Sequence, residues 1–417
     1  MSIVQSLPRR LDSLPTTDNL TLPDVPGWDG GIVQSSERPA LRLATRCIHG
    51  AGPAPDATGA VSTPIYQTAT FAHPGVGQST GFDYTRTENP TRAAFERTMA
   101  ALESGSAAFA FASGMAAIAT VFELFQPGDR IVVSADVYGG THRLFAQVSG
   151  KNGLRFSRAA SDAAIASAIA PGTAAVFIET PSNPTMRVID IAAAARAAHA
   201  AGALLIVDNT FLTPYFQRPL ELGADIVVHS ATKYLAGHND TLAGVAVVAS
   251  PELAERLGAL ACTIGGTLAP FDSWLALRGL KTLACRLDRQ AATAHALAHW
   301  LRRHPAVRDV YYPGFADHPG FAVSRRQASG HGAMVSFRVH DAARAHHALS
   351  SVRLIRFAES LGGTESLLTY PLTQTHADLP EAQRREVGID DCLLRLSVGL
   401  EDERDLRADL ERALGGD

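Results

Sequence analysis

The chain has 417 residues, of which 46% are hydrophobic and 19% charged, and a formal net charge of −4. This length is enough for two domains with their own cores. The charge is nearly balanced and free of long runs of one sign, which argues against nucleic acid or an anionic membrane as a partner. Four scattered cysteines without CxxC spacing are typical of reduced thiols. No secretory signal or bilayer-spanning stretch is evident, so we expect a cytoplasmic protein.

The first 84 residues show little periodicity. Residues 1–40 contain five prolines and several glycines, and we predict a disordered or flexible N-terminal extension. Residues 41–84 are rich in Pro, Gly and Thr, which indicates an extended arm that contacts a neighbouring subunit.

Short apolar runs alternate with helical patterns over residues 85–280. Alternation of strand and helix predicts an α/β domain, with a mostly parallel sheet covered on both faces. Ligands of such sheets bind beyond the carboxyl ends of the strands, and Ser113, Asp208 and Lys233 lie at or just past three of these ends. The predicted strands are 108–111, 130–134, 175–179, 204–208, 225–229 and 243–248, and the predicted helices are 115–125, 141–149 and 189–201.

Residues 281–417 have a different pattern, which predicts a smaller C-terminal α+β domain with its own sheet. It begins with a long helix, followed by further strands and helices. The predicted helices are 286–303, 342–349 and 402–414, and the predicted strands are 310–312, 334–339 and 393–398.

Lys233 stands in the sequence His-Ser-Ala-Thr-Lys-Tyr (229–234), directly after a predicted strand. Lysine is scarce: Lys151 and Lys281 are the only others, and arginine supplies nearly all the remaining positive charge. A lysine amine can lose its proton and act as a nucleophile when its pKa is lowered, whereas a guanidinium cannot. A lysine retained at a strand end therefore indicates a site that needs an amine. The structural alternative is a solvated loop lysine.

Two other strand ends carry complementary groups. Ser113-Gly114-Met115 lies at a strand-to-helix transition, where free backbone N–H groups attract an anion; a turn with an N-cap would give the same pattern. Asp208 is placed to pair with a ring nitrogen, or to close its strand in an Asx turn. An amine, an anion site and a carboxylate at one sheet edge together predict pyridoxal 5′-phosphate (PLP). Its aldehyde takes a lysine amine, and its ring nitrogen needs an acidic partner.

Other ligand-binding patterns are missing or incomplete. No GxGxxG follows a strand, GxxxxGK[ST] does not occur, and no GxSxG stands at a strand-to-helix turn as a nucleophile elbow. His295 and His299 are four residues apart on the predicted long helix, but no carboxylate or cysteine completes a metal site. We therefore predict no metal.

Eight stretches of the chain resemble the Cys/Met-metabolism family of PLP-dependent enzymes, in order and in spacing. This family includes cystathionine γ-synthase, γ-lyase and β-lyase, methionine γ-lyase and O-acylhomoserine sulfhydrylases. The resemblance runs from about residue 43 to the C-terminus and implies PLP-dependent transferase fold type I. The matching stretches are 84–92, 113–117, 137–141, 179–184, 207–211, 229–234 with 237–240, 358–363 and 394–399.

The resemblance implies catalytic roles for three residues. Lys233 would be linked covalently to the cofactor and would move protons, Asp208 would pair with the pyridinium nitrogen, and Tyr138 would stack on the ring. The remaining cofactor contacts would be to the phosphate and the ring hydroxyl. The phosphate would be held by Gly114, Met115, Ser230 and Thr232, and by Tyr84 and Arg86 of a neighbouring subunit, and the ring hydroxyl by Asn183.

The implied substrate is a small amino acid. Arg395 would hold its α-carboxylate through two parallel hydrogen bonds, supported by Ser360 and Thr375. Because Tyr84 and Arg86 would act across an interface, the resemblance implies a homo-oligomer, a tetramer built from dimers that share active sites.

Glu359 matches the γ-synthase and γ-lyase pattern, in which a carboxylate meets the distal amino group of a cystathionine-type ligand; the alternative is a surface carboxylate. Methionine γ-lyases carry a cysteine where this chain has Gly140, which counts against methionine as the main substrate. We predict a trans-sulfuration enzyme that catalyses γ-replacement on an O-acylhomoserine with a thiol such as cysteine. Cystathionine γ-elimination, β-elimination and O-acylhomoserine sulfhydrylation remain alternatives. A non-catalytic protein of this fold would be expected to have lost Lys233, Asp208 or Arg395, and all three are present.

Overall fold

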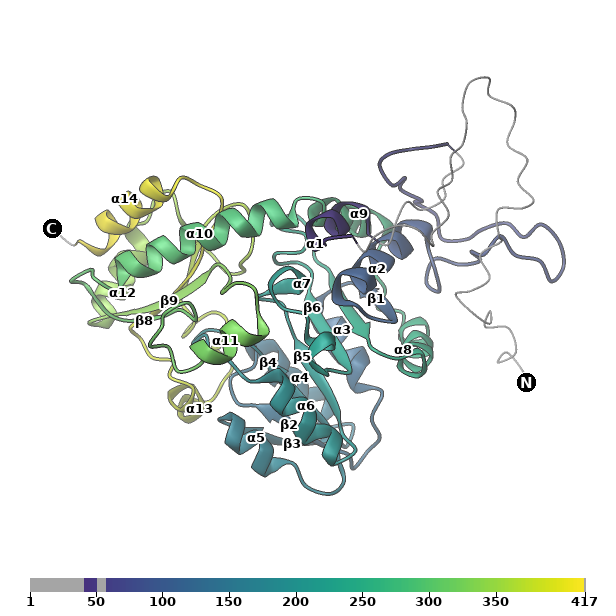
Figure 1. The fold of residues 1–417 in the computed structure, drawn as a ribbon, viewed down its shortest axis with the longest axis horizontal. Helices are drawn as coiled ribbons and strands as arrows, with labels where there is room; N and C mark the ends of the chain where they lie inside the picture. The colour runs from purple at the N-terminus through teal and green to yellow at the C-terminus, as the bar shows by residue number, and fades with distance from the viewer. Residues whose placement is uncertain (1–40, 51–57, 416–417) are drawn as a thin grey trace.

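The computed structural model describes residues 41–50 and 58–415. The predicted N-terminal extension, residues 1–40, lies outside the described residues. The described residues form two regions, each built on one β-sheet, and the long helix α10 (Leu283–Leu301) runs from one to the other (Figure 1). Among the described helices, none combines the length and the apolarity that crossing a membrane would require.

A seven-stranded sheet forms the centre of the larger region. Its strand order is β1-β7-β6-β5-β4-β2-β3, and β7 alone runs antiparallel to its neighbours. Strands β4 to β7 are almost entirely buried, as expected for strands covered by helices on both faces. The predicted mostly parallel sheet is confirmed. The strands are β1 (Ala107–Phe111), β2 (Arg130–Ser134), β3 (Arg155–Ala159), β4 (Thr173–Glu179), β5 (Leu204–Asp208), β6 (Ile226–Ser230) and β7 (Gly244–Val248).

Helices cover both faces of this sheet. On one face α3 (Gly114–Phe122) and α8 (Pro251–Ile264) share a core with Ile206 and Val228. The opposite face is covered by α2 (Pro90–Glu103), α5 (Asp162–Ala168) and α6 (Ile191–Ala200). The other helices of this region are α1 (Leu43–His49), α4 (Gly139–Leu144), α7 (Thr213–Phe216) and α9 (Pro270–Leu280), with a 3₁₀ turn at Pro219–Leu222.

Some elements differ from the sequence prediction. Strand β3, which was not predicted, has the sequence Arg-Phe-Ser-Arg-Ala. This mixture of charged and apolar residues suits a strand at the sheet edge, but it resembles the composition of a loop. Helix α2 was not predicted, although Asn89 caps it and Pro90 occupies its first position. The helix predicted over 141–149 begins at Gly139 and changes at Phe145 to a π-helical turn, Phe145–Ser149.

The C-terminal region has a five-stranded sheet in the order β10-β11-β12-β9-β8. Helices α10, α12 (Ala342–Ser351) and α14 (Glu403–Leu414) pack together beside it. The boundary predicted at 280/281 falls between α9 and α10. The short strands β10 and β11 were not predicted, because two or three residues are too few to show a periodic pattern. The strands are β8 (Val307–Tyr311), β9 (Met334–Val339), β10 (Arg356–Phe357), β11 (Leu367–Thr369) and β12 (Leu393–Ser397), and the remaining helices are α11 (Phe321–Gln327) and α13 (Glu381–Glu386).

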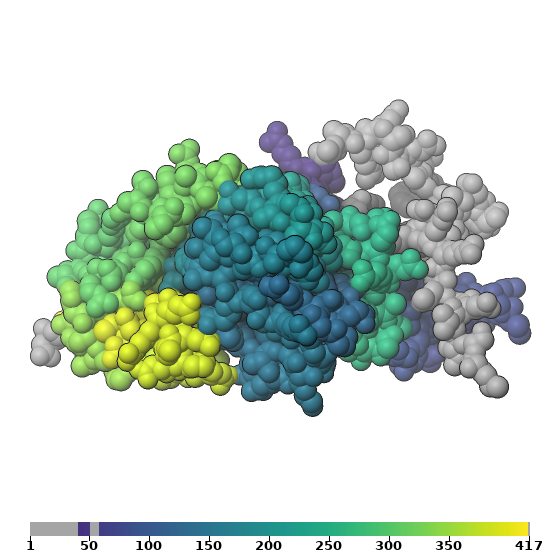
Figure 2. Space-filling view, turned by 90° about the horizontal axis from the view of Figure 1, so that it is seen from below, coloured from purple at the N-terminus to yellow at the C-terminus, as the bar shows by residue number. Residues whose placement is uncertain are grey.

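The predicted arm, 41–84, is only partly extended. It begins with helix α1, whose Cys47 is buried and which contacts α2 and α10. Residues 58–84 then lie at the end of the molecule opposite α14 (Figures 1 and 2). The backbone of Thr63 accepts a hydrogen bond from Trp274 of α9, and that of Tyr66 donates one to Thr91 of α2. Val61 and Val76 in this segment are almost fully exposed, at 98% and 106%. An apolar segment this exposed in one chain is suited to packing against another.

Candidate active site

Four strands deliver polar side chains to one edge of the large sheet. Strands β1, β4, β5 and β6 run in the same direction, so their carboxyl ends meet at that edge. The residues at or just beyond these ends are Ser113, Glu179, Asp208 and Ser230. These four residues therefore lie at a single edge of the sheet.

Lys233 lies in the turn that follows β6. Its Nζ donates a hydrogen bond of 2.8 Å to Oγ of Ser360, which belongs to the C-terminal region. The pKa of Lys233 is lowered from 10.5 to about 8, mainly by burial and also by the nearby cation of Arg395, while the charge of Glu359 acts in the opposite direction. A larger fraction of this amine is therefore unprotonated, and hence nucleophilic, than in an exposed lysine.

Asp208 ends strand β5 and is 8% exposed. Its Oδ1 accepts hydrogen bonds from the N–H of Thr210 at 3.0 Å and from its hydroxyl at 2.6 Å. The same hydroxyl oxygen accepts the N–H of Ser230 at 2.9 Å, which ties β5 to the start of the lysine turn. Burial raises the pKa of Asp208 despite these bonds, and a cation placed against it would favour the ionised form.

The N-terminus of α3 forms a cradle for an anion. Ser113 caps the helix by accepting the N–H of Ala116 at 3.1 Å, while the N–H groups of Gly114 and Met115 have no acceptor within the helix. A Cβ on Gly114 would lie 2.9 Å from Cα and Cβ of Ser230, so the helix end and the end of β6 are in direct contact only because glycine stands there. This arrangement suits a phosphate group.

The hydroxyl of Thr232, also predicted to bind the phosphate, is engaged elsewhere. It donates to the carbonyl oxygen of Ala243 at 3.2 Å and accepts the N–H of Ala243 at 3.0 Å. To donate to a phosphate, this hydroxyl would have to give up the carbonyl of Ala243.

Glu179 joins two predicted cofactor contacts. Its carboxylate accepts the backbone N–H of Tyr138 at 2.8 Å and that of Asn183 at 3.1 Å. The ring of Tyr138 lies over Gly140, where a Cβ would collide with it. Burial raises the pKa of Glu179 well above its usual range, and the neighbouring carboxyl of Asp208 raises it further. Glu179 was not predicted to have a role, although its place at a strand end was a usable signal.

Arg395, on β12, connects the two regions. It is 1% exposed, and its Nη1 donates to Oδ1 of Asn183 at 2.8 Å. Its Nη2 donates to the carbonyl oxygen of Ser360 at 2.9 Å and to Oγ1 of Thr369 at 3.1 Å. Burial lowers the pKa of Arg395 to about 10, so the guanidinium stays charged at neutral pH. Its buried Nε has no hydrogen-bond partner among the described residues, which leaves a donor for a ligand.

The other predicted substrate residues lie beside Arg395. Glu359 is exposed, and its charge acts on both Lys233 and Arg395. Ser360 has a φ of 90°, a strained backbone for a residue other than glycine. The hydroxyl of Thr375 lies 2.8 Å from Nδ1 of His376, a residue that the sequence analysis missed. Burial lowers the pKa of His376 to about 3, which keeps its imidazole neutral.

Tyr84 and Arg86 do not join this group through any of their hydrogen bonds. Nη1 of Arg86 donates to the carbonyl oxygen of Cys262 at 2.7 Å, and its guanidinium lies 5.5 Å from the ring centre of Tyr84. Both side chains are exposed beside the arm. Their predicted role in a neighbouring subunit remains a prediction.

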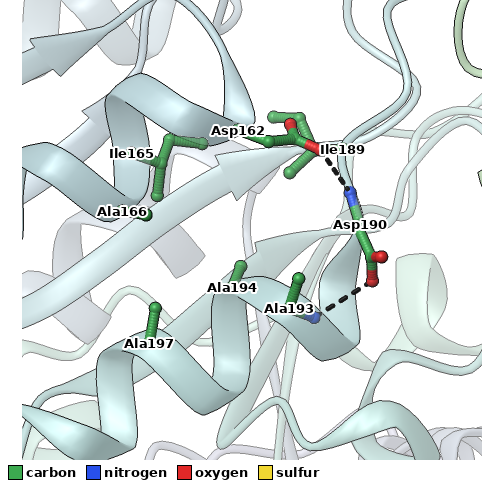
Figure 3. A pocket seen from close by; sticks show the side chains of 8 residues that line it. All are labelled: Asp162, Ile165, Ala166, Ile189, Asp190, Ala193, Ala194 and Ala197. Atoms are coloured by element: carbon green, nitrogen blue, oxygen red, sulfur yellow. Dashed lines mark hydrogen bonds between the residues drawn. The ribbon is translucent and has the colours of Figure 1, made fainter.

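A cavity of about 50 Å³ lies between α5 and α6, and it has none of the predicted site residues in its lining (Figure 3). Its two carboxylates are already bonded: Asp162 accepts the N–H of Asp190 at 3.3 Å, and Asp190 accepts that of Ala193 at 3.0 Å. The space suits water rather than an amino acid.

His295 and His299 are stacked edge to face, with ring centres 4.5 Å apart. Neither belongs to the one group of three possible metal ligands that the described residues bring together, Asp390-Asp391-Cys392.

The donor set at the sheet edge fits PLP. The buried amine suits its aldehyde, the cradle at α3 suits its phosphate, and the carboxyl of Asp208 suits its ring nitrogen. The buried Nε of Arg395 offers an additional donor for the carboxylate of a substrate.

Known proteins of similar sequence differ in their activities. The chain is 48% identical over 376 residues to cystathionine γ-lyase of Bacillus subtilis, with 90% of this chain and 99% of the relative covered. It is 50% identical to cystathionine γ-synthase of Haemophilus influenzae, covering 85% and 93% of the two chains. It is 49% identical to cystathionine β-lyase of Coxiella burnetii, covering 89% and 97%.

The fold agrees with a solved relative. The crystal structure of cystathionine γ-lyase from Lactobacillus plantarum, complexed with L-serine, superposes with a TM-score of 0.88 at 47% identity, covering 90% of this chain and 99% of that one. Residues 44–415 match the family described as Cys/Met metabolism PLP-dependent enzyme. The chain therefore belongs to this family of trans-sulfuration enzymes, has fold type I, and uses pyridoxal phosphate as its cofactor.

Proposed function

We propose that the chain catalyses γ-replacement, in which the Cγ–O bond of an O-acylhomoserine breaks and a Cγ–S bond to a thiol such as cysteine forms. The acyl group leaves as a carboxylate, and the thiol gives up its proton. Sequence identity supports the family but not this reaction, because γ-synthase, γ-lyase and β-lyase relatives all lie between 46% and 50% identity. The site supports a reaction that involves the ammonium group of a second amino acid, and the comparison of two incubations described below decides between replacement and elimination.

The observation that carries the proposal is the position of Glu359. Its carboxylate is exposed next to Ser360, and its charge acts on both Lys233 and Arg395. If Arg395 binds the α-carboxylate of one amino acid, Glu359 offers a partner for the ammonium group of a second amino acid. Cysteine as incoming thiol has such a group, and so does the distal end of cystathionine.

The residues that would hold the cofactor lie at or beyond the carboxyl ends of five strands, β1, β2, β4, β5 and β6. The N–H groups of Gly114 and Met115 and the hydroxyl of Ser230 would bind the phosphate, and Asp208 would face the ring nitrogen. Tyr138 would lie against the ring, and Asn183 against the ring hydroxyl. When bound, the cofactor supplies an electron sink that stabilises negative charge on the substrate carbon.

Lys233 would carry the protons. A γ-substituent leaves only after protons have been removed from both Cα and Cβ, so the base must reach two carbons. The side chain of Lys233 is long and donates a hydrogen bond to Ser360, and its lowered pKa makes the amine available as a base near neutral pH. Arg395 is buried and bonded to Asn183, which would fix the α-carboxylate while the lysine moves.

Cystathionine γ-elimination is the second candidate. The same Glu359 would bind the distal ammonium group of cystathionine, and the γ-lyase of B. subtilis is 48% identical to this chain. The two candidates differ in whether the thiol enters or leaves, and the residues at the site serve both.

Tyr84 and Arg86 would complete the phosphate site of a neighbouring subunit, in dimers that assemble into a tetramer. The exposed apolar side chains of the arm support this part of the proposal. Mixing Arg86→Ala with Lys233→Ala chains, each inactive alone, should restore activity once mixed dimers form. Mixed dimers without activity would contradict the shared site. A cytoplasmic location also belongs to the proposal, supported by four free cysteines.

The deciding experiment compares two incubations. O-acetyl- or O-succinylhomoserine with cysteine should give cystathionine faster than cystathionine alone is broken down. Faster release of 2-oxobutanoate and cysteine from cystathionine would assign γ-elimination instead, and pyruvate with homocysteine would assign β-elimination.

Glu359→Gln tests the carboxylate directly. It should raise KM for cysteine by about tenfold, the loss of one charge-assisted bond, with little change in KM for O-acetylhomoserine. Glu381→Gln, which changes an exposed carboxylate on α13, is the matched control. Equal KM values for cysteine in both variants would contradict the role of Glu359.

A further inference from the structure

The turn that carries Lys233 presents main-chain carbonyl groups to the N-terminal part of α10. The N–H of Gly237 bonds to the carbonyl of Lys233 at 2.8 Å, and the N–H of Ala236 bonds to that of Ala231 at 2.9 Å. The next carbonyls, of Tyr234 and Leu235, come at the end of this turn, where a helix would leave carbonyl groups without partners.

Arg286 of α10 supplies the missing donors. Its Nη1 donates to the carbonyl oxygen of Tyr234 at 2.8 Å, and its Nη2 donates to that of Leu235 at 3.4 Å. Nη2 also donates to the carbonyl of Gly279 at 2.8 Å, and Nε donates to the hydroxyl of Thr282 at 3.1 Å. One planar guanidinium therefore binds the end of the lysine turn to the junction of α9 and α10.

This guanidinium is buried without a carboxylate among its hydrogen-bond acceptors. Arg286 is 3% exposed, and its acceptors are three carbonyls and one hydroxyl. Burial lowers its pKa to about 10, partly offset by the thiols of Cys47 and Cys285, so it is charged at neutral pH. Burying a charge costs free energy unless hydrogen bonds compensate for the lost hydration, and these four acceptors provide that compensation.

Two glycines make the contact possible. Gly237 has a φ of 73°, and a Cβ there would collide with the guanidinium of Arg286. Gly279 lies against the carbonyl group of Ala236, where a Cβ would also collide. The turn therefore lies in direct contact with the backbone of α9 at Gly279 and with the Arg286 side chain of α10.

We propose that Arg286 is a positioning residue for Lys233, and this inference rests on the proposed role of Lys233 as the residue that links to the cofactor. By holding the carbonyls of Tyr234 and Leu235, the guanidinium fixes the backbone next to the lysine. The amine thereby stays buried, within hydrogen-bond distance of Ser360 and under the influence of the charges of Arg395 and Glu359. An ammonium group has no planar fork and cannot hold all four acceptors in one geometry.

The test measures how fast the cofactor-free chain takes up PLP, from the visible absorbance of the linked cofactor, over a range of pH. Arg286→Lys and Arg286→Met are compared with the unchanged chain. Arg344→Lys and Arg344→Met are the matched controls, because Nη1 of Arg344 also donates to a main-chain carbonyl, that of Leu414, but joins α12 to α14. Thermal unfolding of the cofactor-free chains gives the folded fraction, so that each rate refers to folded protein.

We call the hydrogen bonds from Arg286 to the carbonyls of Tyr234 and Leu235 the Arg286 clamp. Loss of this clamp should let Lys233 become more exposed, which moves its pKa up towards 10.5. A rise of one pKa unit leaves about a tenth as much neutral amine, so uptake at pH 7 should slow by about tenfold or more and its pH midpoint should rise. Both changes should appear in the Arg286 variants and not in the Arg344 variants.

A purely structural role would lower the unfolding temperature but leave the rate and the midpoint of the folded chain unchanged, and that result would overturn the inference. If Arg286→Met does not fold, Arg286→Lys decides. Borohydride reduction followed by peptide mapping separates the two claims. A label on Lys151 or Lys281 would refute the role of Lys233 itself, whereas a label on Lys233 at an unchanged rate in the Arg286 variants would refute only the clamp.

Discussion

The reactivity of Lys233 should depend on pH in a way that follows from its surroundings. Burial lowers its pKa from 10.5 to about 8, Arg395 lowers it and Glu359 raises it. At pH 7 an amine of pKa 8 is about 10% unprotonated and one of pKa 10.5 about 0.03%, a difference of about 300-fold. The rate of PLP uptake by the cofactor-free chain should therefore increase with pH and level off above about pH 8.

Glu359→Gln sharpens this prediction. Removing the carboxylate takes away the charge that stabilises the ammonium form, so the pKa of Lys233 should fall further and the plateau should begin at lower pH. Glu381→Gln, whose charge is not among those acting on Lys233, should leave the profile unchanged. Rates are divided at each pH by the rate of a soluble lysine derivative per unprotonated amine, which removes the ionisations of the cofactor itself without adding that of the reference amine.

The opposite profile would refute this reasoning. Uptake that keeps rising to pH 10 would mean that Lys233 titrates like an exposed lysine. An upward shift in Glu359→Gln would mean that the charge of Glu359 does not stabilise the ammonium form.

Three further changes test other parts of the site and fold. Asp208→Asn should reduce kcat by about 10²-fold or more, because the amide cannot balance a cationic ring nitrogen, while circular dichroism stays unchanged; near-normal kcat would exclude that pairing. Arg395→Lys should raise KM for the amino-acid substrate by about 10- to 100-fold with PLP still bound, since an ammonium cannot form parallel hydrogen bonds to a carboxylate; an unchanged KM would place the carboxylate elsewhere. Asp409→Asn should destabilise the C-terminal region by about 1–3 kcal/mol, because Asp409 accepts the N–H groups of Arg353, Leu354 and Ile355. Thermal unfolding checks this, and Asp405→Asn, an exposed change on the same helix, should have little effect.

Much of the large sheet could be predicted because its buried strands have a simple signal. Runs such as 204–208 and 226–230 are apolar on both faces and end in a polar residue, so strand and strand end appear together in the sequence. Strand β3 lacks this signal, because four of its five residues are exposed or only partly buried. The two short strands β10 and β11 depend on tertiary pairing rather than on a local pattern.

The site was predictable only where a residue's own chemistry revealed its role. Lys233 and Asp208 stand at strand ends with reactive groups, whereas Glu179 acts through the backbone N–H groups of Tyr138 and Asn183. Arg286 lies 53 positions after Lys233, and its acceptors are carbonyl groups that every residue possesses. Contacts of this kind become visible only when distant segments are placed side by side.

The most direct test of the account is to identify the residue to which the cofactor is attached. The PLP-loaded chain is reduced with borohydride, digested, and its peptides are analysed by mass spectrometry. The added mass should lie on the peptide that contains Lys233 and should disappear in Lys233→Ala. Attachment to Lys151 or Lys281, or equal labelling in Lys233→Ala, would contradict the assignment of this sheet edge as the active site.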